Sequence, residues 1–239
     1  MYVAVDNFWV LVTYWLVMLV PKGSSGAWSH HHQHCPTFRS TALNRLLELS
    51  HALHTGQTTH LWVLHHVLGH HLNYLDQAKD ESRWRRKDGK PMGELEYALN
   101  VTLTAYPRAF RVGSRYPKER RTFVLFGLLT LAVVGALVIH RPVQGFFLFA
   151  LPMFVSTLFT SWVTFDHHAG LETDDPYSAS YNTLNRWYNL LTGNLGYHTA
   201  HHLRQGVHWS ELPALHAQIE SKIPPHLYKA PGLQALLPG

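Results

Sequence analysis

The sequence predicts an all-α protein, an integral membrane helical bundle whose cytoplasmic side carries a histidine-rich helical cap. Three observations lead to this fold class. The chain is 46% hydrophobic, it is only 15% charged, and it contains 20 histidines, most of them in short clusters. The apolar residues form long blocks, which are typical of membrane spans and not of amphipathic helices. At 239 residues we expect one domain, covering residues 1–239.

Three apolar segments approach the roughly 20 residues that a helix needs to cross a bilayer. They cover residues about 7–20, 122–139 and 145–165. Only a few residues around Arg141 and Pro142 separate the second segment from the third, which predicts a tight helical hairpin. The first segment also resembles a signal peptide, although it lacks a basic n-region.

The distribution of basic residues predicts which side of the membrane each region faces. Of the 20 Lys and Arg residues, 14 lie between Arg39 and Arg121, whereas the tip of the hairpin carries only Arg141. Loops rich in Lys and Arg stay on the cytoplasmic side. A hairpin of two spans returns the chain to the side it left, so the region after residue 165 faces the same way. All clustered histidines fall between Ser24 and Arg121 or after residue 165, on the same predicted side, and we expect their site to face the cytoplasm.

Composition excludes several classes of site. Cys35 is the single cysteine, so the chain has no disulfide framework and no cysteine-rich zinc or iron–sulfur site. The net charge is +5, but the basic residues flank apolar blocks and do not form a stripe with interleaved aromatic residues. We therefore expect no nucleic-acid partner, and any metal must be held by nitrogen or oxygen.

Four histidine clusters occupy residues 30–34, 65–71, 166–168 and 198–202. Residues three or four apart share one face of an α-helix. For the second cluster this spacing predicts that His66 and His70 address one centre. His71 is rotated by roughly 100° from His70 and is expected to serve a second metal on the adjoining face.

The first and fourth clusters have the same kind of spacing. His30 and His34 are four residues apart, and the fourth cluster is expected to direct His198, His201 and His202 at a common centre. Taken alone, the run of histidines from His30 also fits a solvated polar stretch. The clusters together predict a dinuclear metal site. Neutral imidazole suits iron, copper, zinc and nickel, so the ligand type leaves the metal open.

These motifs resemble those of the membrane fatty acid desaturase and hydroxylase superfamily, which includes membrane alkane hydroxylases. The resemblance spans roughly residues 28–216. It implies a di-iron centre with nine histidine ligands and dioxygen as co-substrate. Carried over to this sequence, the metal ligands are His30, His34, His66, His70, His71, His168, His198, His201 and His202. His167 is the alternative to His168, which we prefer because the Ala-Gly-Leu after it resembles a stretch of the alkane hydroxylases.

The resemblance implies an O2-dependent oxidoreductase that acts on a fatty acyl or lipid chain. We expect desaturation, with hydroxylation of an alkyl or acyl chain as the alternative. The spacing at Gly69 resembles the alkane hydroxylases, whereas the surroundings of Asn194 and His208 resemble bacterial acyl desaturases. A non-enzymatic metal-binding or metal-transport protein is a third interpretation. It predicts ionisable groups inside the spans, and segments 123–139 and 145–165 contain none.

The sequence contains no recognisable haem or flavin segment, so we expect a separate electron donor: a ferredoxin, a rubredoxin, or cytochrome b5 with its reductase. The basic stretch 83–87 is a candidate docking surface for an acidic carrier or a lipid headgroup. The acyl chain is expected to lie between the hairpin and the first span. Carboxylates that orient the ligating imidazoles are expected among Asp166, Glu172, Asp174, Asp175 and Glu211.

Two features depart from the family pattern. A single apolar segment precedes the first histidine cluster, where the family commonly has two spanning helices. Thr164 occupies the position, four residues before His168, where relatives often carry an asparagine. These departures leave the wall of the substrate tunnel and a water-mediated role at residue 164 open.

Overall fold

The structure is a computed structural model that describes residues 1–230. Within this range the regular secondary structure is helical, which confirms the predicted fold class. The longer helices are α1 (Phe8–Val17), α2 (Leu19–His34), α3 (Thr41–Thr55), α4 (Glu94–Val112), α5 (Pro117–His140) and α7 (Leu151–His168). The shorter ones are the π-helices η1 (Val63–His71) and η3 (Phe146–Ala150), α6 (Pro142–Gly145), α8 (Arg186–Thr192), α9 (His198–Leu203) and α10 (Leu212–Ile219). Four 3-10 turns complete the set within residues 1–230, at Gly113–Arg115, Trp209–Glu211, Glu220–Lys222 and Pro225–Leu227.

The expected hairpin is present and is longer than its apolar blocks. Two helical stretches are long and apolar enough to cross a membrane, Pro117–His140 and Pro142–His168, and the second runs continuously through α6, η3 and α7. The reversal between them is tight because Gly145 has no side chain. A Cβ atom there would lie 2.6 Å from the Cα atom of Val138 on α5.

The helices before the first histidine cluster form a bent pair. α1 and α2 meet at an angle of 49°, and together they are long and apolar enough for one membrane span. This helical pair extends to His34, whereas the apolar segment predicted from the sequence ends near residue 20. Pro21 explains the bend, since it cannot donate to the carbonyl of Val17 and its ring clashes with that carbonyl. The first histidine cluster therefore forms the last turns of α2, the second helix of this pair.

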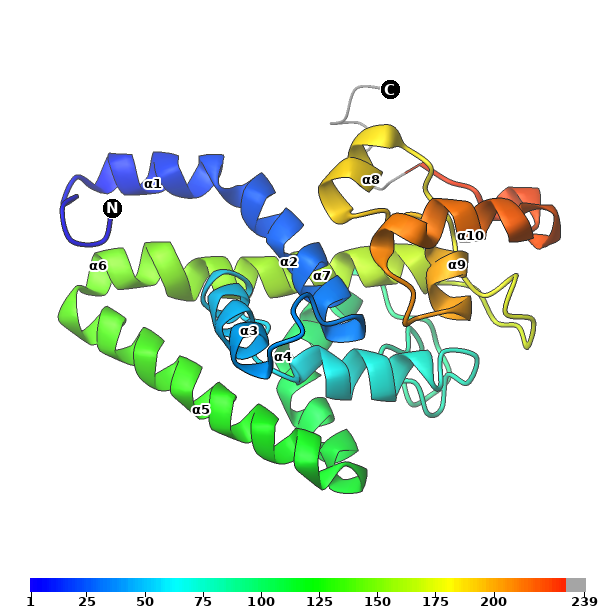
Figure 1. Cartoon of the computed structure of the whole chain (residues 1–239), viewed down its shortest axis with the longest axis horizontal. Coiled ribbons are helices and arrows are strands. Elements are labelled where there is room, and N and C mark those ends of the chain that lie inside the picture. The colour runs from blue at the N-terminus through cyan, green and yellow to red at the C-terminus, as the bar shows by residue number, and fades with distance from the viewer. Residues whose placement is uncertain (231–239) are drawn as a thin grey trace.

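α3 and α4 fill the space between the hairpin arms. α5 and α7 lie close together near α6 and diverge toward their other ends, with α3 and α4 between them (Figure 1). Hydrogen bonds connect α3 and α4 to α7. The hydroxyl of Thr102 on α4 lies 3.2 Å from the hydroxyl of Ser161 on α7, and Thr157 on α7 donates to the carbonyl of Thr55 on α3 over 2.9 Å. Gly56 ends α3 in the left-handed conformation.

The C-terminal segments form a cap over one end of the membrane helices. α8, α9 and α10 gather at the end of α7 that carries His168 (Figure 1). Apolar side chains from this region make a separate core, which consists of Ala200, Leu212, Leu215, Ile219, Ile223 and Leu227. This core holds the short helix α9, and with it the fourth histidine cluster, against the membrane helices.

Candidate metal centre

Nine histidines from four separate segments converge at this end of the bundle. They divide into two adjoining sets. The five-histidine group contains His30, His34, His66, His71 and His201. Each contributes one ring nitrogen, and these five nitrogens lie within 4.8 Å of one another. The four-histidine group contains His70, His168 and His202, which meet the same criterion, together with His198. The Nε2 atom of His198 lies 3.0 Å from that of His168 and 3.2 Å from that of His202.

The second cluster is divided between the groups differently from the sequence-based expectation. His66 and His71 belong together, with Nε2 atoms 2.9 Å apart, whereas His70 belongs to the other group, 3.3 Å from His168. The expected pairing of His66 with His70 is therefore wrong. The reason is the π-helix: Val63–His71 closes its hydrogen bonds from residue i to i+5, so residues five apart come onto one face.

The fourth cluster is also divided, in contrast to the expectation that it addresses one centre. His201 joins the five-histidine group, and its neighbour His202 joins the other with His198. Adjacent residues on a helix differ by about 100° in direction, so α9 presents one ring to each group. A pair of neighbouring histidines thus links the groups here, as His70 and His71 do in the π-helix.

The chemistry of the site fits metal ions. Burial, reinforced by the neighbouring histidines, holds the pKa values of His66, His71 and His201 well below the ordinary 6.5, so these rings are neutral at pH 7. Neutral rings whose nitrogens face each other at about 3 Å direct their lone pairs at a shared point. Two nitrogens bound to one ion at about 2.1 Å lie at most about 4.2 Å apart, close to the separations observed. His201 Nε2 is buried without a hydrogen-bond partner among the described residues, which leaves it available to an ion.

Comparison with known proteins agrees with this arrangement. The family described as fatty acid desaturase matches residues 7–230. This chain belongs to the fatty acid desaturase family. The match takes in both groups of histidines, the two long apolar stretches Pro117–His140 and Pro142–His168, and the bent pair α1–α2.

Two plant members of the family resemble the chain at a distance. One is the chloroplastic sn-2 acyl-lipid omega-3 desaturase (ferredoxin) of Arabidopsis thaliana, 25% identical over 237 residues that include 83% of this chain and 52% of the plant protein. The other is the chloroplastic omega-3 fatty acid desaturase of Brassica napus, 24% identical over 83% of this chain and 58% of the relative. The desaturase-family chain thus spans little more than half the length of these relatives. No solved structure matches it.

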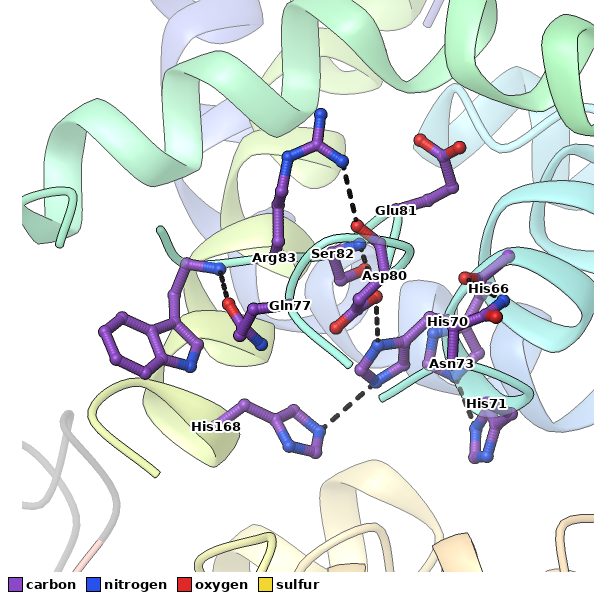
Figure 2. A network of polar contacts seen from close by, with 12 residues as sticks. His66, His70, His71, Asn73, Gln77, Asp80, Glu81, Ser82, Arg83 and His168 are labelled. Carbon is purple, nitrogen blue, oxygen red and sulfur yellow. Dashed lines mark hydrogen bonds and ion pairs between the residues drawn. The ribbon is translucent and has the colours of Figure 1, made fainter. Parts of the chain in front are cut away.

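Asp80 is the carboxylate that contacts a histidine of the site. It is buried, and His70 donates to it through Nδ1–H over 2.8 Å, which turns Nε2 toward His168 (Figure 2). The carbonyls of Ala179 and Leu195 accept from the Nδ1 atoms of His168 and His198 in the same way. Backbone oxygens thus orient these two imidazole rings, where the sequence predicts carboxylates.

The five carboxylates proposed from the sequence do not orient the histidines of either group. Asp166 forms an ion pair with Lys229, Glu172 with Arg85, and Asp175 accepts from Ser178. Glu211 accepts from the neighbouring Ser210, and no contact to a histidine of either group is found for Asp174 within residues 1–230. Sequence reasoning missed Asp80 because it lies ten residues beyond His70, in a loop that carries no regular pattern.

Gly69 explains how that loop reaches the site. A Cβ atom at Gly69 would lie 2.8 Å from Cγ of Glu81, and the Glu81 amide donates to the Gly69 carbonyl over 3.2 Å. The missing side chain lets the loop lie directly on the π-helix. Gly69, whose spacing in the second cluster resembles the alkane hydroxylases, therefore serves the placement of Asp80.

At the third cluster, the preferred residue His168 lies in the four-histidine group and His167 does not. The Nε2 atom of His167 instead accepts from the Tyr188 hydroxyl over 2.9 Å, and its ring stacks on His198 at 3.9 Å between centroids. Thr164, the residue in place of the family asparagine, donates to the carbonyl of Thr160 within its own helix. Its hydroxyl is thus committed to the helix.

The residues around the fourth cluster hold the backbone that leads into α9. Asn194 takes a positive φ of 64° after the left-handed Gly193, and its amide donates to the Trp209 carbonyl over 3.2 Å. Buried Asn189, which sequence reasoning missed, accepts from the amide of Gly196 and donates to the carbonyl of Thr183. The motif that resembles bacterial acyl desaturases is therefore a structural anchor for His198.

Loss of the charge on Asp80 is expected to loosen one metal. In Asp80→Asn the amide oxygen still accepts from His70 but carries no negative charge, and changes of this kind typically lower metal affinity by about 10–100-fold. Metal content after dialysis against a graded series of chelators measures the effect. Asp76→Asn, an exposed change in the same loop, is the matched control. Equal retention of metal by Asp80→Asn and the wild type would contradict the role given to Asp80.

The metal-free protein is expected to lose stability as the pH falls below about 6.5. Burial lowers the pKa of His198 and His202 in the folded state, so below 6.5 the unfolded chain binds more protons than the folded chain. Each such histidine removes up to about 1.4 kcal/mol per pH unit. Thermal midpoints in detergent at pH 7.5, 6.5 and 5.5 test this, and a midpoint that stays constant refutes it.

Proposed function

We propose that this chain is a membrane-bound, non-haem di-iron oxidoreductase that uses dioxygen to desaturate the acyl chain of a lipid. The observation that carries the proposal is the convergence of nine buried histidines into two adjoining groups. Membership of the desaturase family supports iron as the metal and an acyl chain as the substrate. The ligands proposed for the two iron ions are the members of the five-histidine and four-histidine groups.

The bound iron ions would supply the activation of dioxygen that removal of hydrogen from an unactivated carbon requires. In the overall reaction, two hydrogen atoms of adjacent methylenes, two electrons and two protons reduce dioxygen to two water molecules and leave a carbon–carbon double bond. The chain contributes position. Asp80 and the carbonyl of Ala179 fix the rings of His70 and His168, and burial of the groups keeps bulk water out.

An apolar cavity beside the site supports an elongated lipid substrate. It has a volume of about 440 Å³ and lies between the bent pair α1–α2 and α7. Its near end reaches Tyr188 and Thr192, which hydrogen-bond His167 and His31 respectively. Since His167 stacks on His198, the side chains of Tyr188 and His167 connect this end of the cavity to the four-histidine group. We propose that the acyl chain approaches the metals through this cavity.

Electrons are proposed to come from a separate small carrier of the ferredoxin type, because one relative is named as a ferredoxin-dependent enzyme. The docking face proposed is the basic stretch 83–87, in which Arg85 and Arg86 pair with Glu172 and Glu96. The excess of basic residues in the central segment supports a site that faces the cytoplasm. We propose that residues 1–239 belong to one desaturase-like domain.

Product analysis tests the proposal. The chain is expressed with a ferredoxin and its reductase in cells of defined lipid composition, and the extracted lipids are compared with those of cells that make His201→Ala. We expect new unsaturated chains and about two iron ions per chain with the wild type alone. Hydroxylated chains as the sole product, or products that do not depend on iron, would refute desaturation.

A further inference from the structure

A lysine lies inside the first membrane span without an acidic partner. Lys22 belongs to α2, one residue after Pro21, and is only 6% exposed. Its Nζ atom lies 3.4 Å from Nδ1 of His54 and donates to the Leu148 carbonyl over 3.2 Å. No carboxylate within residues 1–230 lies within 4.0 Å of it. An ionisable side chain at membrane depth is costly, and such residues are generally functional.

Lys22 lines the apolar cavity described above, and a second polar donor lines it as well. The indole Nε1–H of Trp15 is buried and has no acceptor within the described residues. Trp15 and Lys22 are seven residues apart, two helical turns, so both face the cavity despite the bend between α1 and α2. The rest of the lining is mainly apolar, with Leu19, Val20, Pro152, Val155, Phe159 and Trp162 among its members.

Two hydrogen-bond donors in a cavity of this kind call for an acceptor. The amine of Lys22 carries up to three N–H donors, and two neutral acceptors contact it. The indole N–H of Trp15 has no acceptor within residues 1–230. A buried donor left without a partner costs free energy that a ligand oxygen recovers. A plain hydrocarbon chain fills the apolar part of the cavity but gives no acceptor to the Trp15 N–H group or to a third N–H of Lys22.

We propose that this cavity binds an aliphatic chain bearing an oxygen atom, a hydroxyl or keto group, which accepts from Lys22 and Trp15. Lys22 and His30 lie eight residues apart on α2, about 12 Å along its axis. If the bound chain is the substrate of the proposed function, on which this step rests, its oxygen would lie about 12 Å along the α2 axis from the five-histidine group. The binding itself requires no metal.

Equilibrium binding of two matched probes tests the proposal on the metal-free full chain. Radiolabelled 1-dodecanol and dodecane are titrated in detergent micelles, with partition into empty micelles subtracted. We expect 1-dodecanol to bind roughly tenfold more tightly than dodecane, since a buried donor left without an acceptor typically costs that much. In Lys22→Met, and separately in Trp15→Phe, this preference falls to roughly threefold or less.

The controls keep the outcome independent of folding and of catalysis. Trp15→Phe preserves an aromatic ring and removes only the N–H group, so it remains informative if Lys22→Met does not fold. Lys79→Met changes an exposed lysine paired with Asp76 and is expected to leave both affinities unchanged. Equal binding of the two probes to the wild type, or a preference that survives both variants, overturns the proposal. Because iron is absent, failure of the proposed desaturation would leave this result unaffected.

Discussion

His201→Ala is expected to abolish product formation and to lower the iron content of the purified protein from two ions per chain to about one. His201 belongs to the five-histidine group, where its Nε2 atom has no other partner among the described residues. Loss of a residue that only orients a ligand already costs about 10–100-fold in affinity or activity, so loss of a ligand itself is expected to cost more. Iron is measured by mass spectrometry and the product by chromatography of extracted lipids.

The exposed His226 provides the matched control for this prediction. His226→Ala removes an imidazole from the same C-terminal region without touching either group, and we expect it to keep both iron and activity. If His201→Ala retained two ions and formed product at the wild-type rate, the assignment of His201 to the metal site would fail.

Gly196→Ala is expected to destabilise the cap strongly. A Cβ atom at residue 196 would lie 2.0 Å from the carbonyl oxygen of Thr183 and 2.7 Å from Oδ1 of Asn189. The Thr183 oxygen is backbone and cannot rotate away, so the segment that leads into α9 must move. Overpacking typically costs 1–3 kcal/mol, and we expect about 3 kcal/mol for this variant because the clash is with backbone.

A loss of about 3 kcal/mol corresponds to a fall of roughly 6–12 °C in the thermal midpoint of a chain of this size. Displacement of α9 would also move His198, so iron retention is expected to fall together with the midpoint. Gly135→Ala is the control, because a Cβ atom at that position on α5 meets nothing within 4 Å. A midpoint for Gly196→Ala within about 2 °C of the wild type would show that the backbone adjusts without strain.

The sequence is sufficient to predict the fold class and the convergence of the histidines. Long apolar blocks are visible without a structure, and the hairpin formed by α5 and α7 follows from two of them. The histidine spacing indicates two metals. The preference for His168 over His167 comes from the resemblance to a known family, and the contacts of the two rings agree with it.

The internal division of the site could not be predicted, because it depends on backbone geometry that spacing does not reveal. An α-helical reading of residues 63–71 pairs His66 with His70, and only the π-helical hydrogen bonds bring His66 to His71. Asp80 likewise lies in an irregular loop, which reaches the site because Gly69 leaves room for it. Lys22 has no sequence signal of its own, since the apolar segment ends before it.

The division of neighbouring histidines between the groups has a mechanical consequence. His70 and His71 are consecutive, as are His201 and His202, and each pair sends one ring to either side. Consecutive Cα atoms are held 3.80 Å apart by covalent bonds that thermal motion does not stretch. Two peptide linkages therefore join the five-histidine group to the four-histidine group. A displacement of α2 or α7 alone therefore cannot separate the two groups of histidines, because η1 and α9 each contribute a ring to both.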